Sequence, residues 1–134
     1  MKIDGACHCG FITFEAEADP EKTAICHCTD CQTLSGSAFR TAIPVPAATF
    51  RLLSGEPATY VKTADSGAKR AQGFCPRCGT ALYATSAEGK PAVYSVRVGT
   101  VRQRDRLVPR SQVWTRSRLP WVCMLVALPS IETQ

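Results

Sequence analysis

Seven of the eight cysteines fall into three short clusters, and thiolates at such spacings are ligands that zinc prefers. The clusters are Cys7 and Cys9 in CHCG, Cys26, Cys28 and Cys31 in CHCTDC, and Cys75 and Cys78 in FCPRCGT. In a reducing compartment, closely spaced cysteines more often hold a metal than form disulfides. The eighth, Cys123, lies alone in an apolar run, and we expect it to be a buried thiol.

The CPRCG motif supplies half of a tetrahedral site, because C-x-x-C followed by glycine turns two thiolates toward one ion. A redox pair would require a helix after Cys78, but residues 81–85 (ALYAT) are typical of a strand. CHCG is the natural donor of the second pair, giving a closed zinc site that stabilises the fold. Pairing Cys75 and Cys78 with two cysteines of the central cluster remains an alternative, and it leaves a remainder of three.

With the first partition, Cys26, Cys28 and Cys31 form a C-x-C-x-x-C set. Three protein ligands plus one open position are typical of a catalytic zinc site. An all-sulfur site of this kind suits an incoming thiolate better than it suits the activation of water. His27 stands between two ligands and should point to the opposite side, so we expect it, like His8, beside the ligands or at the surface rather than on the metal.

The elements that must position these cysteines are short strands. Residues 11–18 (FITFEAEA) alternate apolar and polar side chains with a period of two. Further strands are predicted over 22–26, 38–45, 48–53, 58–63, 81–85 and 92–99. One helical turn is predicted over 29–36, with Thr29 as its cap and Gly36 ending it. The expected fold is a mainly antiparallel β domain with little helix, a single domain over residues 1–134, whose loops carry the cysteines.

Composition and charge narrow the function classes. The N-terminus lacks an apolar signal region, so we expect a cytoplasmic protein. Residues 121–128 form the longest apolar run, which is far too short to span a membrane and is expected to be a buried C-terminal segment. The net charge is +5, and the arginines between Arg97 and Arg118 form either a solvated basic face or an anion-binding rim. No recognition helix or basic stripe indicates nucleic-acid binding.

Five segments in order, GACHCGFITFE, CHCTDCQTLSGSAF, FCPRCGTALY, VRVGT and LVPRSQVWTRSRLPW, resemble the glutathione-dependent formaldehyde-activating enzyme family, also called the CENP-V/GFA group. The resemblance spans Gly5 to Trp121 and implies a β-tent of antiparallel sheets. It also implies two zinc ions per chain: a structural ion on Cys7, Cys9, Cys75 and Cys78, and a catalytic ion on Cys26, Cys28 and Cys31. The implied activity is carbon–sulfur lyase chemistry in the synthetic direction, in which glutathione, as co-substrate, and formaldehyde give S-hydroxymethylglutathione.

On this resemblance the glutathione thiolate would take the open position of the catalytic zinc, with formaldehyde held beside it. Candidate donors to the developing alkoxide are Ser35, Ser37 and the amides near Gly36. Candidate partners for the glutathione carboxylates are Arg40, Lys69, Arg70 and Arg97.

Two segments depart from the family pattern, since VRQRDR follows Thr100 where an acidic pair is common, and Gln72 and Gly73 stand where an arginine is common. Trp114 and Trp121 could wall the thiol pocket or pack as core or lid. The rival hypothesis is a zinc-binding scaffold for another protein that does no catalysis.

Overall fold

The computed structural model describes residues 1–134 and is mainly β, as predicted from the sequence. One α-helix of seven residues and several 3-10 turns interrupt ten strands. The strands are β1 (Lys2–Ala6), β2 (Thr13–Glu17), β3 (Ala24–Cys26), β4 (Arg40–Pro46), β5 (Arg51–Ser54), β6 (Ala58–Thr63), β7 (Lys69–Phe74), β8 (Ala81–Ser86), β9 (Val93–Arg97) and β10 (Ser111–Val113). The helical elements are η1 (Pro20–Lys22), α1 (Thr29–Ser35), η2 (Val98–Thr100), η3 (Arg104–Arg106), η4 (Thr115–Ser117) and η5 (Pro120–Ala127).

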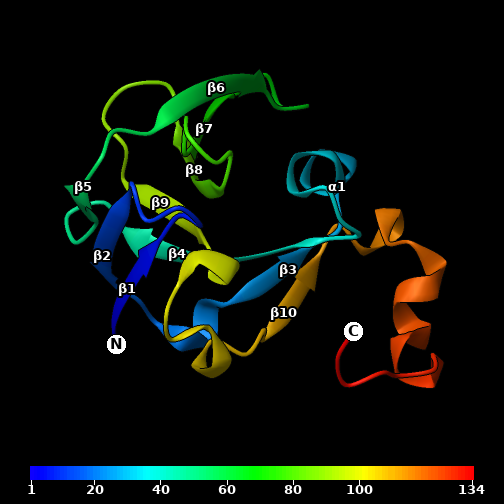
Figure 1. Cartoon of the computed structure of the whole chain (residues 1–134). Coiled ribbons are helices and arrows are strands. Elements are labelled where there is room, and N and C mark those ends of the chain that lie inside the picture. The colour runs from blue at the N-terminus through cyan, green and yellow to red at the C-terminus, as the bar shows by residue number, and fades with distance from the viewer.

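The strands form two sheets. The smaller has the order β1-β2-β5, and the larger has the order β10-β3-β4-β9-β8-β7-β6. All pairs are antiparallel except β10 with β3, which is parallel. Figure 1 shows β1 and β2 on one side of β4 and β9, with α1 beyond the far end of β4. The larger sheet therefore runs from the C-terminal β10 to the hairpin of β6 and β7.

The hydrophobic core fills the space between the two sheets. From residue 11 to residue 18, Ile12, Phe14, Ala16 and Ala18 are buried, while the residues between them are half-buried or exposed. This period-two pattern confirms the predicted strand, since successive side chains point to opposite faces of a sheet. Cys7 and Cys75 belong to the same buried cluster, so two of the predicted metal ligands are anchored in the core.

All seven predicted strands are present, six of them with shifted ends, and three further strands were missed. β1 carries Asp4 and Gly5, which hide its alternation, yet Gly5 is required there because a Cβ would lie 2.4 Å from the Phe14 ring. The sequence of β7, KRAQGF, has no apolar alternation. Backbone hydrogen bonds to β6 on one side and β8 on the other hold it in the sheet. β10 has three exposed residues and is defined by pairing with β3 alone.

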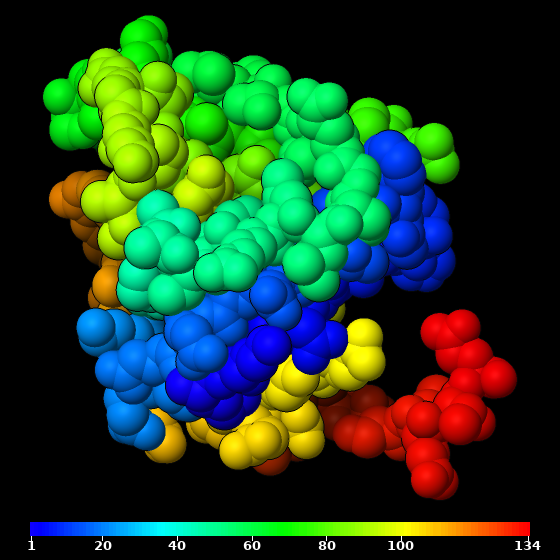
Figure 2. Space-filling view, turned by 90° about the vertical axis from the view of Figure 1, so that its left-hand side faces the viewer, coloured from blue at the N-terminus to red at the C-terminus, as the bar shows by residue number.

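The prediction of a buried C-terminal segment is wrong. Residues 120–127 form η5, which has no buried residue. Most of its apolar side chains face solvent, with Val126 fully exposed and only Val122 half-buried. Cys123 is accordingly exposed and not a buried thiol. The last residues project from the body of the molecule (red in Figure 2). None of the helices has the length and apolar character that a membrane crossing requires.

Candidate metal centres and the pocket between them

Four cysteines that are up to 71 positions apart in the sequence meet at one point. The Sγ atoms of Cys7, Cys9, Cys75 and Cys78 all lie within 4.8 Å of one another. Cys7 and Cys9 sulfurs are 3.6 Å apart, and Cys9 and Cys75 sulfurs are 3.8 Å apart. Four thiolates at 2.3 Å from a tetrahedral zinc would be about 3.8 Å from each other. The four thiols are free, and their spacing fits a zinc ion rather than a disulfide, whose sulfurs are about 2.05 Å apart.

Two similar turns present these sulfurs. In the first, the Gly10 amide donates to the Cys7 carbonyl at 3.1 Å, and in the second the Gly79 amide donates to the Cys75 carbonyl at 2.9 Å. Gly10 and Gly79 have φ values of 79° and 76°, a left-handed conformation that glycine adopts without strain. The sequence therefore places glycine directly after each cysteine pair because the turn requires it.

Backbone and hydroxyl donors stabilise thiolates in this cluster. The Ile12 amide donates to the Cys7 sulfur at 3.2 Å, and the Arg77 amide donates to the Cys75 sulfur at 3.4 Å. The Thr80 hydroxyl, 3.1 Å from the Cys78 sulfur, and then the Thr80 amide lower the pKa of Cys78 to about 5. The effect is uneven across the cluster: the Phe11 amide favours the Cys9 thiolate, but desolvation and the neighbouring thiols outweigh it and raise the pKa of Cys9 to about 11. Since thiolates, not thiols, are the metal ligands, Cys78 is the ligand that the chain itself prepares best.

The second cluster consists of Cys26, Cys28 and Cys31, whose sulfurs also lie within 4.8 Å of one another. Cys26 ends β3, and Cys28 is the N-cap of α1, where its sulfur accepts a hydrogen bond from the Cys31 amide at 3.3 Å. The predicted cap, Thr29, is instead the first residue of the helix. The predicted end at Gly36 is confirmed, with a φ of 64°. The helix therefore starts on one candidate ligand and carries the next one a turn later.

No fourth cysteine, histidine or carboxylate joins these three sulfurs. His27 is not part of this cluster; it is fully buried, with its Nε2 2.8 Å from the Gln112 Oε1 on β10. Asp30 is engaged elsewhere, since its carboxylate pairs with Lys62 at 2.6 Å. The donor set thus fits a zinc ion with three protein ligands and one position to spare. That the two clusters bind zinc stays a prediction, but their geometry agrees with the partition of seven cysteines into four and three.

Arg40 connects the three-cysteine cluster to the interior. The pairing of β3 with β4 sets Arg40 opposite Cys26, and its Nη2 donates to the Cys31 sulfur at 2.9 Å. Burial, followed by the neighbouring Cys26 thiol, raises the pKa of Cys31 to about 12. The guanidinium of Arg40 opposes this effect, because a nearby positive charge favours the thiolate.

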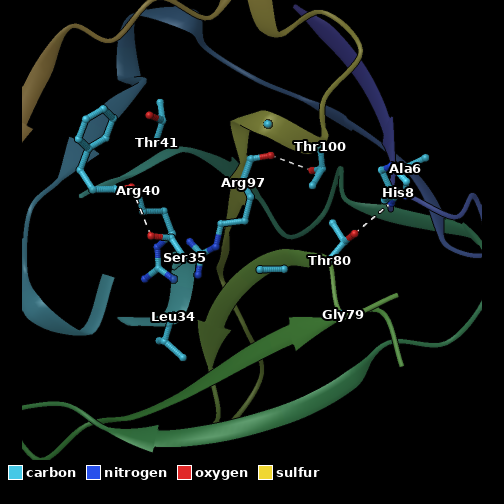
Figure 3. Close-up of a pocket in the computed structure, with 13 residues that line it drawn as sticks. Ala6, His8, Leu34, Ser35, Arg40, Thr41, Gly79, Thr80, Arg97 and Thr100 are labelled. Carbon is cyan, nitrogen blue, oxygen red and sulfur yellow. Dashed lines mark hydrogen bonds between the residues drawn. The ribbon is translucent and has the colours of Figure 1, made fainter. Parts of the chain in front are cut away.

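A pocket of about 620 Å³ lies between the two clusters. One wall comes from the turns that hold the four-cysteine cluster and includes His8, Gly79 and Thr80. The opposite wall comes from α1 and the start of β4 and includes Leu34, Ser35 and Arg40. Figure 3 shows the side chains of Arg40 and Arg97 inside this pocket, with the hydrogen bond from the His8 amide to the Thr80 hydroxyl on the other side. Its volume falls within the range of about 300–1,000 Å³ typical of small-molecule sites.

The structure separates the candidate carboxylate partners. Arg40 and Arg97 are buried and line the pocket, whereas Lys69 is exposed and donates to the Thr63 hydroxyl at 2.7 Å. Arg70 is half-buried and is not among the residues that line this pocket. Of the seven arginines from Arg97 to Arg118, Arg97 is thus buried rather than part of a solvated basic face.

The candidate alkoxide donors are largely occupied by local hydrogen bonds. The Ser35 hydroxyl donates to the carbonyls of Gln32 and Phe39, at 3.3 and 3.4 Å. The Gly36 and Ser37 amides also donate to carbonyls of α1, and the Ser37 side chain is exposed. These groups end the helix, so their geometry supports the capping role over the catalytic one.

A second, smaller pocket of about 370 Å³ lies against Cys28. Its lining includes Lys62, whose charge contributes to lowering the pKa of Cys28, although burial, the largest effect, opposes the shift. Trp114 also lines it and is the one non-glycine residue with a positive φ, 57°. Sequence reasoning missed Lys62; its only signal was a place on a predicted strand. Trp121 lies in exposed η5 and is not among the residues that line either pocket.

Comparison with known proteins identifies a similar structure and a family for the chain. A crystal structure of a Rhodobacter sphaeroides protein is similar, with a TM-score of 0.62 and 21% sequence identity over 82% of this chain and 99% of that one; at this identity the likeness shows the fold. The family model of the glutathione-dependent formaldehyde-activating enzyme matches residues 2–117, which include both cysteine clusters. The chain therefore belongs to the glutathione-dependent formaldehyde-activating enzyme family.

Proposed function

We propose that this protein is a zinc-dependent carbon–sulfur lyase that acts on a small thiol adduct, with the formation of S-hydroxymethylglutathione from glutathione and formaldehyde as its reaction. The observation that carries the proposal is the second cluster, in which three sulfurs meet without a fourth protein ligand. A protein that used its cysteines for folding alone would need only the closed four-cysteine site. Family membership supports the same chemistry.

The roles of the residues follow from their positions. Cys26, Cys28 and Cys31 would hold the catalytic zinc, and Cys7, Cys9, Cys75 and Cys78 would hold the structural one. Zinc on three thiolates leaves one position for an incoming thiol and keeps that thiol deprotonated near neutral pH. The chain itself contributes Arg40, which offsets negative charge on Cys31, and Gln32, whose amide donates to the His27 and Ser117 carbonyls and fixes α1 against η4.

The pocket between the clusters would hold the rest of the thiol next to formaldehyde. Addition of the sulfur to the carbonyl carbon forms one C–S bond, and the oxygen takes up the proton that the thiol released. Holding both reactants in one pocket lowers the entropic part of the barrier, which is the main contribution expected of the protein here.

Three further parts of this proposal concern the protein as a whole. We propose that residues 1–134 act as one domain, which is supported by a core that includes both Ile3 and Leu107. A cytoplasmic location is supported by eight free cysteines, which a reducing compartment preserves. The proposed partner is a small-molecule thiol, with neither nucleic acid nor membrane.

The test measures, by exchange NMR on zinc-loaded protein, whether S-hydroxymethylglutathione forms faster than it does without the protein. Cys28→Ser should lose the enhancement and about one zinc per chain, whereas Cys123→Ser, which changes an exposed thiol outside both clusters, should keep both. If protein with two zinc ions gives no enhancement, the lyase proposal fails.

One observation favours a second candidate, the scaffold that binds another protein. η5 exposes Trp121, Met124, Leu125 and Val126 together, and contiguous exposed apolar surface often marks an interaction site. Two zinc ions without rate enhancement, combined with capture of a partner that is lost on deleting residues 120–128, would support the scaffold.

A further inference from the structure

The C-terminal part of the chain holds most of the exposed apolar surface. Eight of the fourteen large apolar side chains that are exposed in the whole protein lie between residues 113 and 131. They are Val113, Trp114, Trp121, Met124, Leu125, Val126, Leu128 and Ile131. Figure 1 shows this segment (orange to red) at the edge of the molecule. Contiguous apolar surface is uncommon on a monomer unless another molecule covers it.

The chain as a whole is also more exposed than a monomer of its mass should be. Its accessible surface is 8388 Å², whereas a compact monomer of 14.5 kDa exposes about 6,900 Å². The excess of about 1,500 Å² is larger than the roughly 800 Å² that each partner buries in a standard protein–protein interface. The projecting C-terminal segment contributes to this excess, so a partner that covered it would bring the chain close to the expected exposure.

η5 receives little support from its own chain. Its eight residues form a 3-10 helix, and such helices are uncommon beyond three or four residues because their hydrogen bonds are poorly aligned. An isolated helix of this length is marginal in water. The family model ends at residue 117, so η5 lies outside the part of the chain that the family shares. Packing against an external surface would supply the stabilisation that the body of the protein does not give.

The charges on either side of the apolar segment indicate what would cover it. No charged residue lies between Arg118 and Glu132, and neither of these two takes part in any of the five ion pairs. A two-fold axis across η5 would place the segments of two copies antiparallel, with Arg118 of each copy near Glu132 of the other. Parallel segments would bring like charges together instead. The charges therefore favour an antiparallel pair of identical segments.

We propose that η5 forms the interface of a homodimer, in which the exposed apolar side chains of residues 121–131 pack antiparallel against the same residues of a second copy. A two-fold interface must be complementary to itself, and an apolar surface with opposite charges at its two ends meets this requirement. The proposal does not depend on the lyase reaction. It assigns to a second copy the surface that otherwise favours the scaffold hypothesis.

Sedimentation equilibrium of zinc-loaded protein under reducing conditions, over a range of concentrations, tests the assembly. The wild type should show a reversible equilibrium between monomer and dimer. Val126 is fully exposed in the single chain, so Val126→Asp should leave the melting temperature of dilute protein unchanged. It should weaken the dimer about a hundredfold or more, because each copy would bury an unpaired charge. Val108→Asp, the same change at an exposed valine outside the segment, should leave the dimer unaltered.

Two further measurements test the antiparallel arrangement. Arg118→Glu should weaken the dimer about tenfold by placing like charges together, and the addition of Glu132→Arg should restore it. Cys123 is exposed and lies near the middle of η5, so the two copies of this residue should lie near each other at the two-fold axis. A short bis-maleimide should therefore link two copies, and Cys123→Ser should remove the cross-link while the dimer remains.

The outcomes separate the possible occupants of this surface. A wild type that stays monomeric at about 100 µM would overturn the homodimer, and capture of another protein through η5 by that monomer would give the surface to the scaffold hypothesis. A dimer that Val126→Asp does not weaken would place the interface elsewhere and would also overturn the proposal. Failure of Glu132→Arg to restore the dimer, or a wild-type dimer without the cross-link, would refute the antiparallel packing. All of these measurements are made without substrate, so a failure of the proposed lyase reaction would not affect them.

Discussion

Replacing Cys28 by serine should separate metal binding from folding. Cys28 is half-buried, lies outside the hydrophobic core cluster and serves as the N-cap of α1. Serine is among the best N-cap residues, so its hydroxyl can accept the Cys31 amide that the sulfur accepts now. Compared with wild-type protein that lacks this second zinc, the free energy of unfolding should therefore change by no more than about 1 kcal/mol. For a protein of this size such a change moves the melting temperature by only about 3–5 °C.

Replacing Cys75 by serine should have the opposite outcome. Cys75 is fully buried in the core, so its variant loses a metal ligand and also buries a hydroxyl, which costs about 1–3 kcal/mol if it is left unpaired. A structural zinc contributes about 10–16 kcal/mol in small zinc domains, comparable to the whole stability of about 5–15 kcal/mol of a typical protein.

Elemental analysis and thermal denaturation of both variants would test this contrast. Cys28→Ser should retain about one zinc and a cooperative transition, and Cys75→Ser should retain neither. If Cys28→Ser unfolded as fully as Cys75→Ser, the division into a structural and an exchangeable site would be wrong.

Further perturbations address other parts of the molecule. Burial, followed by the neighbouring tyrosine, raises the pKa of Tyr83 above its ordinary value of 10.0. The folded state therefore favours the neutral phenol, and this stability is present below pH 10 and lost as the pH rises through the higher folded value. Urea unfolding of Tyr83→Phe should thus show a shallower loss above pH 10 than the wild type; an identical slope would refute the assignment. Gly5→Ala should destabilise the protein by about 1–3 kcal/mol through its clash with Phe14, whereas Gly99→Ala, which meets open space, should cost little. In zinc-loaded protein a thiol reagent should react rapidly with one cysteine, and Cys123→Ser should abolish this fast phase; more than one fast thiol would argue against metal protection of the others.

The strand content could be predicted because alternation is a local property. Ile12 and Phe14 reveal their burial in the sequence, since polar residues stand between them. β7 could not be found in this way, because a strand that pairs on both sides is specified by its neighbours and needs no alternation of its own. The apolar run in η5 misled for the converse reason, since apolar composition favours burial but does not supply a surface to pack against.

The grouping of the cysteines could be predicted because ligand number and spacing restrict the partition strongly. The burial of the side chains in the pocket between the two cysteine clusters could not be predicted. In the sequence, Arg40 and Arg97 could not be told apart from the other two candidate carboxylate partners. Their burial depends on the pairing of β4 with β9 and on Gln72, which accepts a hydrogen bond from Arg97 across the sheet from β7. Likewise, Cys28 became the helix cap in place of Thr29 because its sulfur, rather than the threonine hydroxyl, faces the free amide.

The two walls of the central pocket differ in how firmly they are held, and this has a consequence for selectivity. The wall from His8, Gly79 and Thr80 is tied to Cys7 and Cys75, which are packed in the core. The wall from α1 belongs to a seven-residue helix with one buried residue. A ligand would therefore contact one rigid wall of the pocket and one wall that can move more easily. An added group on the ligand that faces the rigid wall should lower its affinity strongly, whereas an added group that faces α1 should lower it little. The affinity of related ligands would therefore depend more on where they branch than on how large they are.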